Sequence, residues 1–159
     1  MKKLLFVFAM LLSVNMASAQ FSNNGIGLRL GSGDGFGTEI SFQHRLKDVN
    51  RIELDLGTNS NNQYSAWSLA GIYQWTYGID EHLSWFAGAG GRIGSWSQNK
   101  AYIGEDNTGG MLLAAVGNVG LEYSFPIGIQ IGLDARPEIG LIHGGLLRNS
   151  LALSVRYQF

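Results

Sequence analysis

The sequence predicts an all-β protein, an eight-stranded antiparallel up-and-down transmembrane β-barrel, from two observations. Eight segments alternate between apolar and polar residues with a period of two, which is the period of a strand. Every charged residue within these segments falls on the polar phase, so one face of the sheet is apolar and the other is ionic. Strands of about 10 residues suffice for a tilted bilayer crossing, and an even number of them can close into a barrel.

The amino terminus has the order of a cleaved secretory signal peptide, which we expect to comprise residues 1–19. Lys2 and Lys3 precede an apolar run over residues 4–14, and small residues at 17–19 precede Gln20. The alternative is a permanent helical anchor, but the apolar run is about half of the roughly 20 residues that a membrane-spanning helix needs. The barrel domain is then expected to span residues 20–159.

Composition excludes several classes of function. The formal net charge is −1 and no basic stripe is present, so we expect no nucleic-acid partner. The absence of cysteine excludes disulfides, thiolate metal sites and a catalytic thiol. The chain has 23 glycines and 2 prolines, which is not typical of a soluble helical domain.

The first half of the chain contains four predicted strands. The first carries Arg29 on its polar phase and leads into Asp34-Gly35, a pair that accepts the positive φ of a hairpin turn. The second carries Glu39 and is followed by a polar turn that includes Arg45. The fourth alternates least regularly, since Ile72 shares the phase of polar neighbours. These strands are expected over residues 25–31, 36–43, 51–56 and 67–75.

The second half repeats the pattern. The fifth segment follows a compact turn at 78–82, and the sixth ends at Pro126, where a missing N–H does least harm. The seventh alternates most clearly, with apolar residues at odd positions and Asp134, Arg136 and Glu138 at even ones. These strands are expected over residues 83–94, 115–125, 127–139 and 147–159, with shorter turns at one end of the barrel than at the other.

Twelve charged residues share the polar phase, six arginines and six carboxylates. A basic side chain facing lipid near the bilayer midplane costs about 2–4 kcal/mol, so this phase is expected to face the lumen. An eight-stranded barrel is just wide enough for its own side chains to fill, and arginine can hold a carboxylate through two hydrogen bonds. We therefore interpret the set as a lumen ion-pair network that plugs the barrel. Its members are Arg29, Glu39, Arg51, Glu53, Asp55, Arg92, Glu122, Asp134, Arg136, Glu138, Arg148 and Arg156.

A soluble barrel with an apolar interior is the alternative architecture. Lysine is nearly absent from the strands, although a water-facing surface usually mixes it with arginine. Aromatic residues gather toward the strand ends, as in the interface girdles of membrane barrels. The apolar residues are also large enough to overfill a small lumen. These observations favour the membrane-spanning arrangement.

The final predicted strand carries the most specific resemblance to a known family. It ends on Phe159, with Tyr157 two residues earlier and apolar residues at alternate positions before them. With Tyr73-Gln74-Trp75 and Arg136-Pro137-Glu138, the chain resembles the small eight-stranded outer-membrane β-barrel proteins of Gram-negative bacteria, of the OmpA-like and Bacteroidetes types.

The resemblance implies a place in the bacterial cell outer membrane, in contact with outer-membrane lipid and lipopolysaccharide, as a monomer. It also implies that Tyr157 and Phe159 form a C-terminal assembly signal, which the outer-membrane assembly machinery recognises.

No catalytic, cofactor or metal site is expected. The acidic group at 105–107 lacks the alternating ligands of a calcium loop. Some barrels of this size modify lipid A, and a serine nucleophile would need a nearby histidine. His44 and His82 lie toward the wrong end for the outer leaflet, which leaves His143, with Ser150 seven residues later.

We therefore expect a non-enzymatic barrel with a structural or adhesive role, binding any extracellular ligand through loops at 58–63, 97–110 and 140–146. Two alternatives remain open at this point. One is a narrow channel for ions or small solutes, in which the lumen pairs rearrange. The other is a lipid A modifying enzyme.

Overall fold

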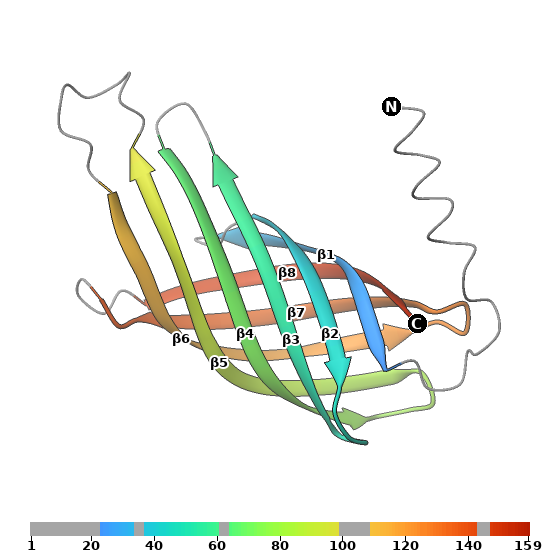
Figure 1. Cartoon of the computed structure of the whole chain (residues 1–159). Coiled ribbons are helices and arrows are strands. Elements are labelled where there is room, and N and C mark those ends of the chain that lie inside the picture. Colours follow the sequence, from blue (N-terminus) through green and yellow to red (C-terminus); the bar gives the residue numbers. More distant parts are fainter. Residues whose placement is uncertain (1–22, 34–36, 61–63, 99–108, 143–146) are drawn as a thin grey trace, which may run out of the picture.

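The eight predicted strands are present and form one closed antiparallel barrel in sequence order (Figure 1). The computed structural model describes residues 23–33, 37–60, 64–98, 109–142 and 147–159, and the predicted signal peptide lies outside these ranges. The fold class is therefore confirmed. The strands are β1 (Asn24–Gly33), β2 (Thr38–Arg45), β3 (Asn50–Ser60), β4 (Tyr64–Gly78), β5 (Leu83–Gln98), β6 (Gly109–Ser124), β7 (Ile129–Gly140) and β8 (Leu147–Gln158).

Pairing between the first and last strands closes the barrel. The ladder between β1 and β8 runs from Gly25 opposite Gln158 to Gly33 opposite Ser150. Just before it, Asn24 and Phe159 exchange two backbone hydrogen bonds, of 3.2 and 2.9 Å. Every strand therefore has a neighbour on each side, which removes the exposed edges that would otherwise invite aggregation.

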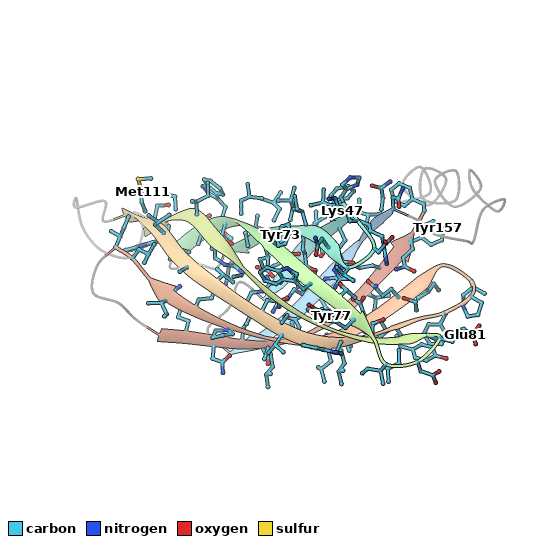
Figure 2. All side chains as sticks on the ribbon, turned by 90° about the horizontal axis from the view of Figure 1, so that it is seen from below. Lys47, Tyr73, Tyr77, Glu81, Met111 and Tyr157 are labelled. Atoms are coloured by element: carbon cyan, nitrogen blue, oxygen red, sulfur yellow. The ribbon has the colours of Figure 1, made fainter. Side chains whose placement is uncertain are left out.

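The two ends of the barrel differ. The turn end carries the short connections 46–49, 79–82 and 125–128 together with the start of β1 and the end of β8 (Figure 1). Here Gly128 adopts a φ of 79°, which a side chain would disfavour, and its N–H donates to the carbonyl of Phe125. The other four connections join strands at the opposite end, the loop end. Lys47 and Glu81 mark the turn end and Met111 the loop end in Figure 2.

Several strand boundaries differ from the predicted ones. β4, β5 and β6 are 15 or 16 residues long and extend beyond β1 and β8 at the loop end (Figure 1). The sequence did not predict this extension, because Ser95 and Ser97 are polar and the apolar phase fades where both faces of a strand leave the lipid. β2 begins at Thr38 and continues to Arg45, so Arg45 belongs to a strand and the prediction that it lies in a turn is wrong.

The barrel has a polar interior and an apolar outer surface. Arg136 is fully buried, whereas Leu133, on the other phase of the same strand, is 58 % exposed. Large apolar side chains such as Leu28, Ile40 and Leu54 are exposed on successive strands. A soluble barrel would have the opposite arrangement, so this outer surface fits the hydrocarbon of a bilayer. No helix in the described part of the chain is long and apolar enough to cross a membrane.

Aromatic residues surround the turn end of β4 to β8. Tyr77 stacks on Trp85 with ring centroids 5.0 Å apart, and Tyr123 meets Phe125 edge-on at 4.7 Å. Tyr157 and Phe159 stack at 6.4 Å. Rings of this kind have an apolar body and, in tyrosine and tryptophan, a polar group, which suits the boundary between lipid and water. This girdle marks one edge of the membrane-spanning band.

Candidate functional site

Among the described residues, eleven charged side chains are buried in the lumen, and we call them the lumen network. They come from seven of the eight strands, because the inward phase of each strand carries its charges to the same interior space. Arg148 is the one member of the predicted set that lies apart. It is half-buried at the loop end and forms no ion pair with a residue that the structure describes. The network consists of Arg29, Glu39, Arg51, Glu53, Asp55, Arg92, Glu122, Asp134, Arg136, Glu138 and Arg156.

Arg136 occupies the centre of the lumen network. From β7 its Nη2 atom donates to Glu53 Oε1 at 2.7 Å, and Nη1 lies 2.9 Å from Asp55 Oδ2. Nη1 also lies 3.5 Å from Glu39 Oε2. These carboxylates belong to β2 and β3, which are not neighbours of β7 in the sheet. One guanidinium therefore links opposite walls of the barrel.

Glu39 also forms ion pairs with two further arginines, on the side of the lumen nearer the loop end. Arg29 Nη1 donates to Glu39 Oε2 at 2.8 Å, and Arg92 Nη1 donates to Glu39 Oε1 at 2.6 Å. Arg29 also donates to Asp134 Oδ1 at 2.7 Å, and Arg92 donates from Nε to Glu138 Oε1 at 2.9 Å. Each of these arginines thus holds two carboxylates from different strands.

Arg156 and Gln43 donate further hydrogen bonds to Glu53, on the side facing the turn end. Arg156 Nη2 donates to Glu53 Oε2 at 3.0 Å, and Nε donates to the Ser41 hydroxyl at 2.9 Å. Gln43 adds a 2.6 Å hydrogen bond to Glu53 Oε2. Uncharged polar residues on the inward phase therefore take part in the network.

Arg51 and Glu122 form the pair nearest the turn end. Arg51 Nη1 donates to Glu122 Oε1 at 2.7 Å, Nε donates to the Gln74 amide oxygen, and the guanidinium carbon lies 4.8 Å from the centre of the Phe86 ring. The amide of Gln74 donates to Asn118 at 2.7 Å, and Asn118 donates to Asp134 at 3.1 Å. This chain joins the pair to the rest of the network.

The remaining interior is filled by small and apolar side chains of β4, β5 and β6. Ala70, Ile72, Phe86, Ala114 and Val116 are buried there. Inward glycines make room for the larger members of this wall. A Cβ atom at Gly120, for example, would lie 2.6 Å from the Phe86 ring and would displace it.

The charged side chains of the lumen network pair across the lumen, and each of these residues is 7 % exposed or less. Removing one partner of a buried ion pair typically costs about 3–5 kcal/mol, because the other charge stays buried. The arrangement can therefore brace the strands and block passage.

The other residues singled out in the sequence are separated from one another. His44 Nδ1 lies 2.8 Å from the side-chain oxygen of Asn24, and the His82 ring meets Tyr123 edge-on at 5.8 Å. Ser150 is buried and accepts a 3.3 Å hydrogen bond from Arg29. His143 and the acidic group at 105–107 lie outside the described residues. Within the described ranges, no group of three or more histidine, aspartate or glutamate residues is arranged to hold a metal ion.

Sequence reasoning missed two features of the site. Gln43, Gln74 and Asn118 connect the charged residues, and their place on the inward phase could have revealed them. The position of Arg45 directly opposite Arg51 was also missed, because the sequence pattern predicted a turn at that point.

Comparison with known proteins supports the architecture. No protein-family model and no curated protein matches the chain. The N-terminal β-barrel domain of Pseudomonas aeruginosa OprF is similar in structure, with a TM-score of 0.67 and 15 % identity over 87 % of this chain and 100 % of that one.

Two further solved structures are similar. Neisserial surface protein A gives a TM-score of 0.61 and 14 % identity, covering 86 % of this chain and 94 % of its own. Ail, the attachment invasion locus protein of Yersinia pestis, gives a TM-score of 0.58 and 11 % identity, covering 87 % of this chain and 97 % of its own. At these identities the similarity establishes the fold, and the chain has the fold of small eight-stranded outer-membrane β-barrels.

Proposed function

We propose that this protein is an integral β-barrel of a bacterial outer membrane, with a plugged, non-conducting lumen and a structural or adhesive role at its loop end. Residues 1–19 act as the signal peptide, and residues 20–159 form the barrel. In the membrane the turn end faces the periplasm and the loop end faces the outside, because outer-membrane barrels have short periplasmic turns.

The continuity of the lumen network is the observation that carries this proposal. A solute crossing the barrel would have to separate Arg136 from its three carboxylate partners and Arg51 from Glu122. Separating buried ion pairs leaves their charges without partners in the lumen, so opening such a passage is energetically unfavourable. We therefore assign the functional surface to the loop end.

The shape of the loop end supports an adhesive role. β4, β5 and β6 extend beyond β1 and β8 at the loop end (Figure 1). Exposed apolar side chains sit near this end, with Met111 72 % exposed and Leu141 61 % exposed. Ail, which is named for attachment and invasion, has the same eight-stranded fold.

Tyr157 and Phe159 are proposed to be the signal that the outer-membrane assembly machinery recognises. They stack on each other at the outer surface of β8, where Phe159 is 44 % exposed. An aromatic pair on the lipid-facing side of the closing strand is accessible to a partner before β8 pairs with β1. Replacing both residues by alanine should lower the amount of barrel in the outer membrane without lowering synthesis.

A lipid A modifying activity is less well supported. Ser150 is buried against Arg29 rather than presented on the outer surface, so it is poorly placed as a nucleophile for a lipid substrate. Release of an acyl chain from lipid A that is lost in a His143→Ala variant would contradict the non-enzymatic proposal.

Bacteria that produce the protein provide the test of the adhesive role. Cells carrying the full chain are compared with cells in which residues 99–108 are replaced by a short glycine and serine linker. Both proteins should fractionate with the outer membrane and show a heat-dependent shift on a gel, which reports the folded barrel. Adhesion to host-cell or matrix surfaces should fall only in the linker variant, and the role is structural if the two strains adhere equally.

A further inference from the structure

We propose that the turn end of the lumen contains a binding site for one small oxyanion, a phosphate or carboxylate group, between Arg45 and Arg51. These two arginines, with Asn24, Gln43 and Gln158, line a small pocket of about 20 Å³ that opens to solvent. The site is separate from the loop end to which we assign the main role.

The two arginines are brought together by strand register. Arg45 on β2 pairs directly with Arg51 on β3. Residues directly opposite in an antiparallel ladder have Cβ atoms about 4.5–5.5 Å apart, and like charges at such positions destabilise the pairing. Arg51 is neutralised by Glu122 at 2.7 Å, whereas Arg45 donates to the backbone carbonyl of Asp48 and forms no ion pair with the described residues. The pocket therefore has an excess positive charge.

Arg51 presents a buried donor at this place. It is 5 % exposed, its Nε and Nη1 atoms bind Gln74 and Glu122, and its Nη2 atom is buried without a hydrogen-bond partner among the described atoms. A buried hydrogen-bond donor without an acceptor destabilises a fold, and a charged donor does so more strongly. Because the guanidinium is also held over Phe86, its orientation is fixed. An acceptor at the pocket would satisfy Nη2.

The other lining groups also favour an anion. Asn24 lies on the outward phase of β1, where its side-chain oxygen is 2.8 Å from His44 Nδ1, so the first amide on the inward phase of the pocket is that of Gln43. The backbone of Asn24 is fixed by its pairing with Phe159. Gln158 adds a second amide, and no carboxylate is among the lining residues. Guanidinium and amide donors together match the oxygens of phosphate and carboxylate groups.

The pocket is small and open to solvent, so it can bind no more than one anionic group at its mouth. Its inner side is closed, because Gln43 donates to Glu53 and Arg51 donates to Glu122. A ligand can enter from the turn end but cannot continue into the lumen. The site thus binds at the mouth and does not conduct.

Titration of the purified full-length protein tests this site. The protein is folded in a nonionic detergent at low chloride and titrated with inorganic phosphate and, separately, with sodium acetate. The side-chain Nε–H signals of arginine are followed by NMR. We expect saturable shifts of the Arg45 and Arg51 signals with phosphate, acetate or both, at a dissociation constant of about 1 mM or below.

Two matched variants give the test its specificity. Arg45→Gln should weaken binding at least about tenfold. Arg148→Gln removes one positive charge at the opposite end of the lumen and should leave binding unchanged. A heat-dependent gel shift confirms that both variants are folded. Shifts that never saturate, or equal weakening in the two variants, would overturn the proposal, since both results indicate general electrostatic attraction to arginine side chains rather than a defined site.

Discussion

The two walls of the lumen are lined by different kinds of side chain. β4, β5 and β6 contribute mostly small and apolar side chains, such as Ala70, Ile72 and Val116. β1 to β3 with β7 and β8 contribute most of the charges, including Arg136 and its partners Glu53 and Asp55. The apolar wall carries only Arg92 and Glu122 of the lumen network, whereas the ionic wall carries the other nine members, which pair across strands that are not neighbours.

This difference has an energetic consequence. Truncating a buried side chain of the apolar wall removes packing contacts in proportion to the volume that is lost. Removing one charged side chain from the ionic wall leaves its partner buried without a counter-charge. The free-energy cost of that unpaired charge is larger than the cost of the lost contact itself. The ionic wall should therefore contribute more than the apolar wall to both the stability and the impermeability of the barrel. Substitutions in the ionic wall should lower the free energy of unfolding more than substitutions in the apolar wall.

The largest effect is expected for Arg136→Met. The variant keeps a side chain of similar length but leaves Glu39, Glu53 and Asp55 without their shared guanidinium. The free energy of unfolding should fall by about 3–5 kcal/mol, measured by urea unfolding in lipid vesicles. Arg148→Met is the control, and it should change stability by less than about 0.5 kcal/mol because Arg148 forms no ion pair with the described residues. Equal losses in both variants would remove the distinction between the network and a general need for arginine.

The next effect comes from placing a charge on the wrong face of the ionic wall. Leu133 lies on the lipid-facing phase of β7, directly before Asp134 of the lumen network. Leu133→Arg should cost about 2–4 kcal/mol in the same vesicles, since a basic side chain would face hydrocarbon. Leu133→Met conserves apolar character and should cost much less. An arginine tolerated at this position would argue against a lipid-facing surface.

A double-mutant cycle on Arg51 and Glu122 tests whether charge pairing itself stabilises the network. Each single change, Arg51→Met or Glu122→Leu, leaves a buried partner behind and should destabilise the barrel. The double variant should recover part of the loss, giving a coupling energy of about 1–3 kcal/mol between the two residues. Additive losses would mean that the two side chains act independently despite their 2.7 Å contact.

The smallest effect is expected on the apolar wall. Ile72 is 1 % exposed in β4, so Ile72→Val removes one buried methylene and should cost about 0.5–1.5 kcal/mol. Conductance should stay unchanged, because the ionic wall remains intact. A loss as large as that of Arg136→Met would show that the two walls contribute equally.

The sequence predicted which residues of each strand face the lumen. This was possible because alternation is a property of a single strand and does not depend on which strands pair. Even β4 follows its predicted phase, since Ile72 is buried beside Ser68 and Gln74. The sequence could not predict which arginine meets which carboxylate. Those contacts depend on the register between strands and on how far each side chain reaches, as in the contact of Arg29 with Asp134, 105 residues apart.

Features near the strand ends were the least predictable. Arg148 shares the inward phase but lies at the loop end, where the barrel opens and its charge stays half-buried. Arg45 was expected in a turn, because His44 and Arg45 begin a polar stretch that gives no sign of continued pairing. In both cases alternation identifies the face of a residue, but its depth in the barrel is a property of the closed fold.

Single-channel recording in planar bilayers tests the central claim of a closed, self-paired lumen most directly. The wild-type protein, inserted at concentrations where a known porin conducts, should produce no discrete current steps. Arg136→Ala, which opens the centre of the ionic wall, is expected to be the first variant to produce them. Discrete steps in the wild-type protein that change when Arg136 or Glu122 is neutralised would contradict a closed lumen and would identify a channel.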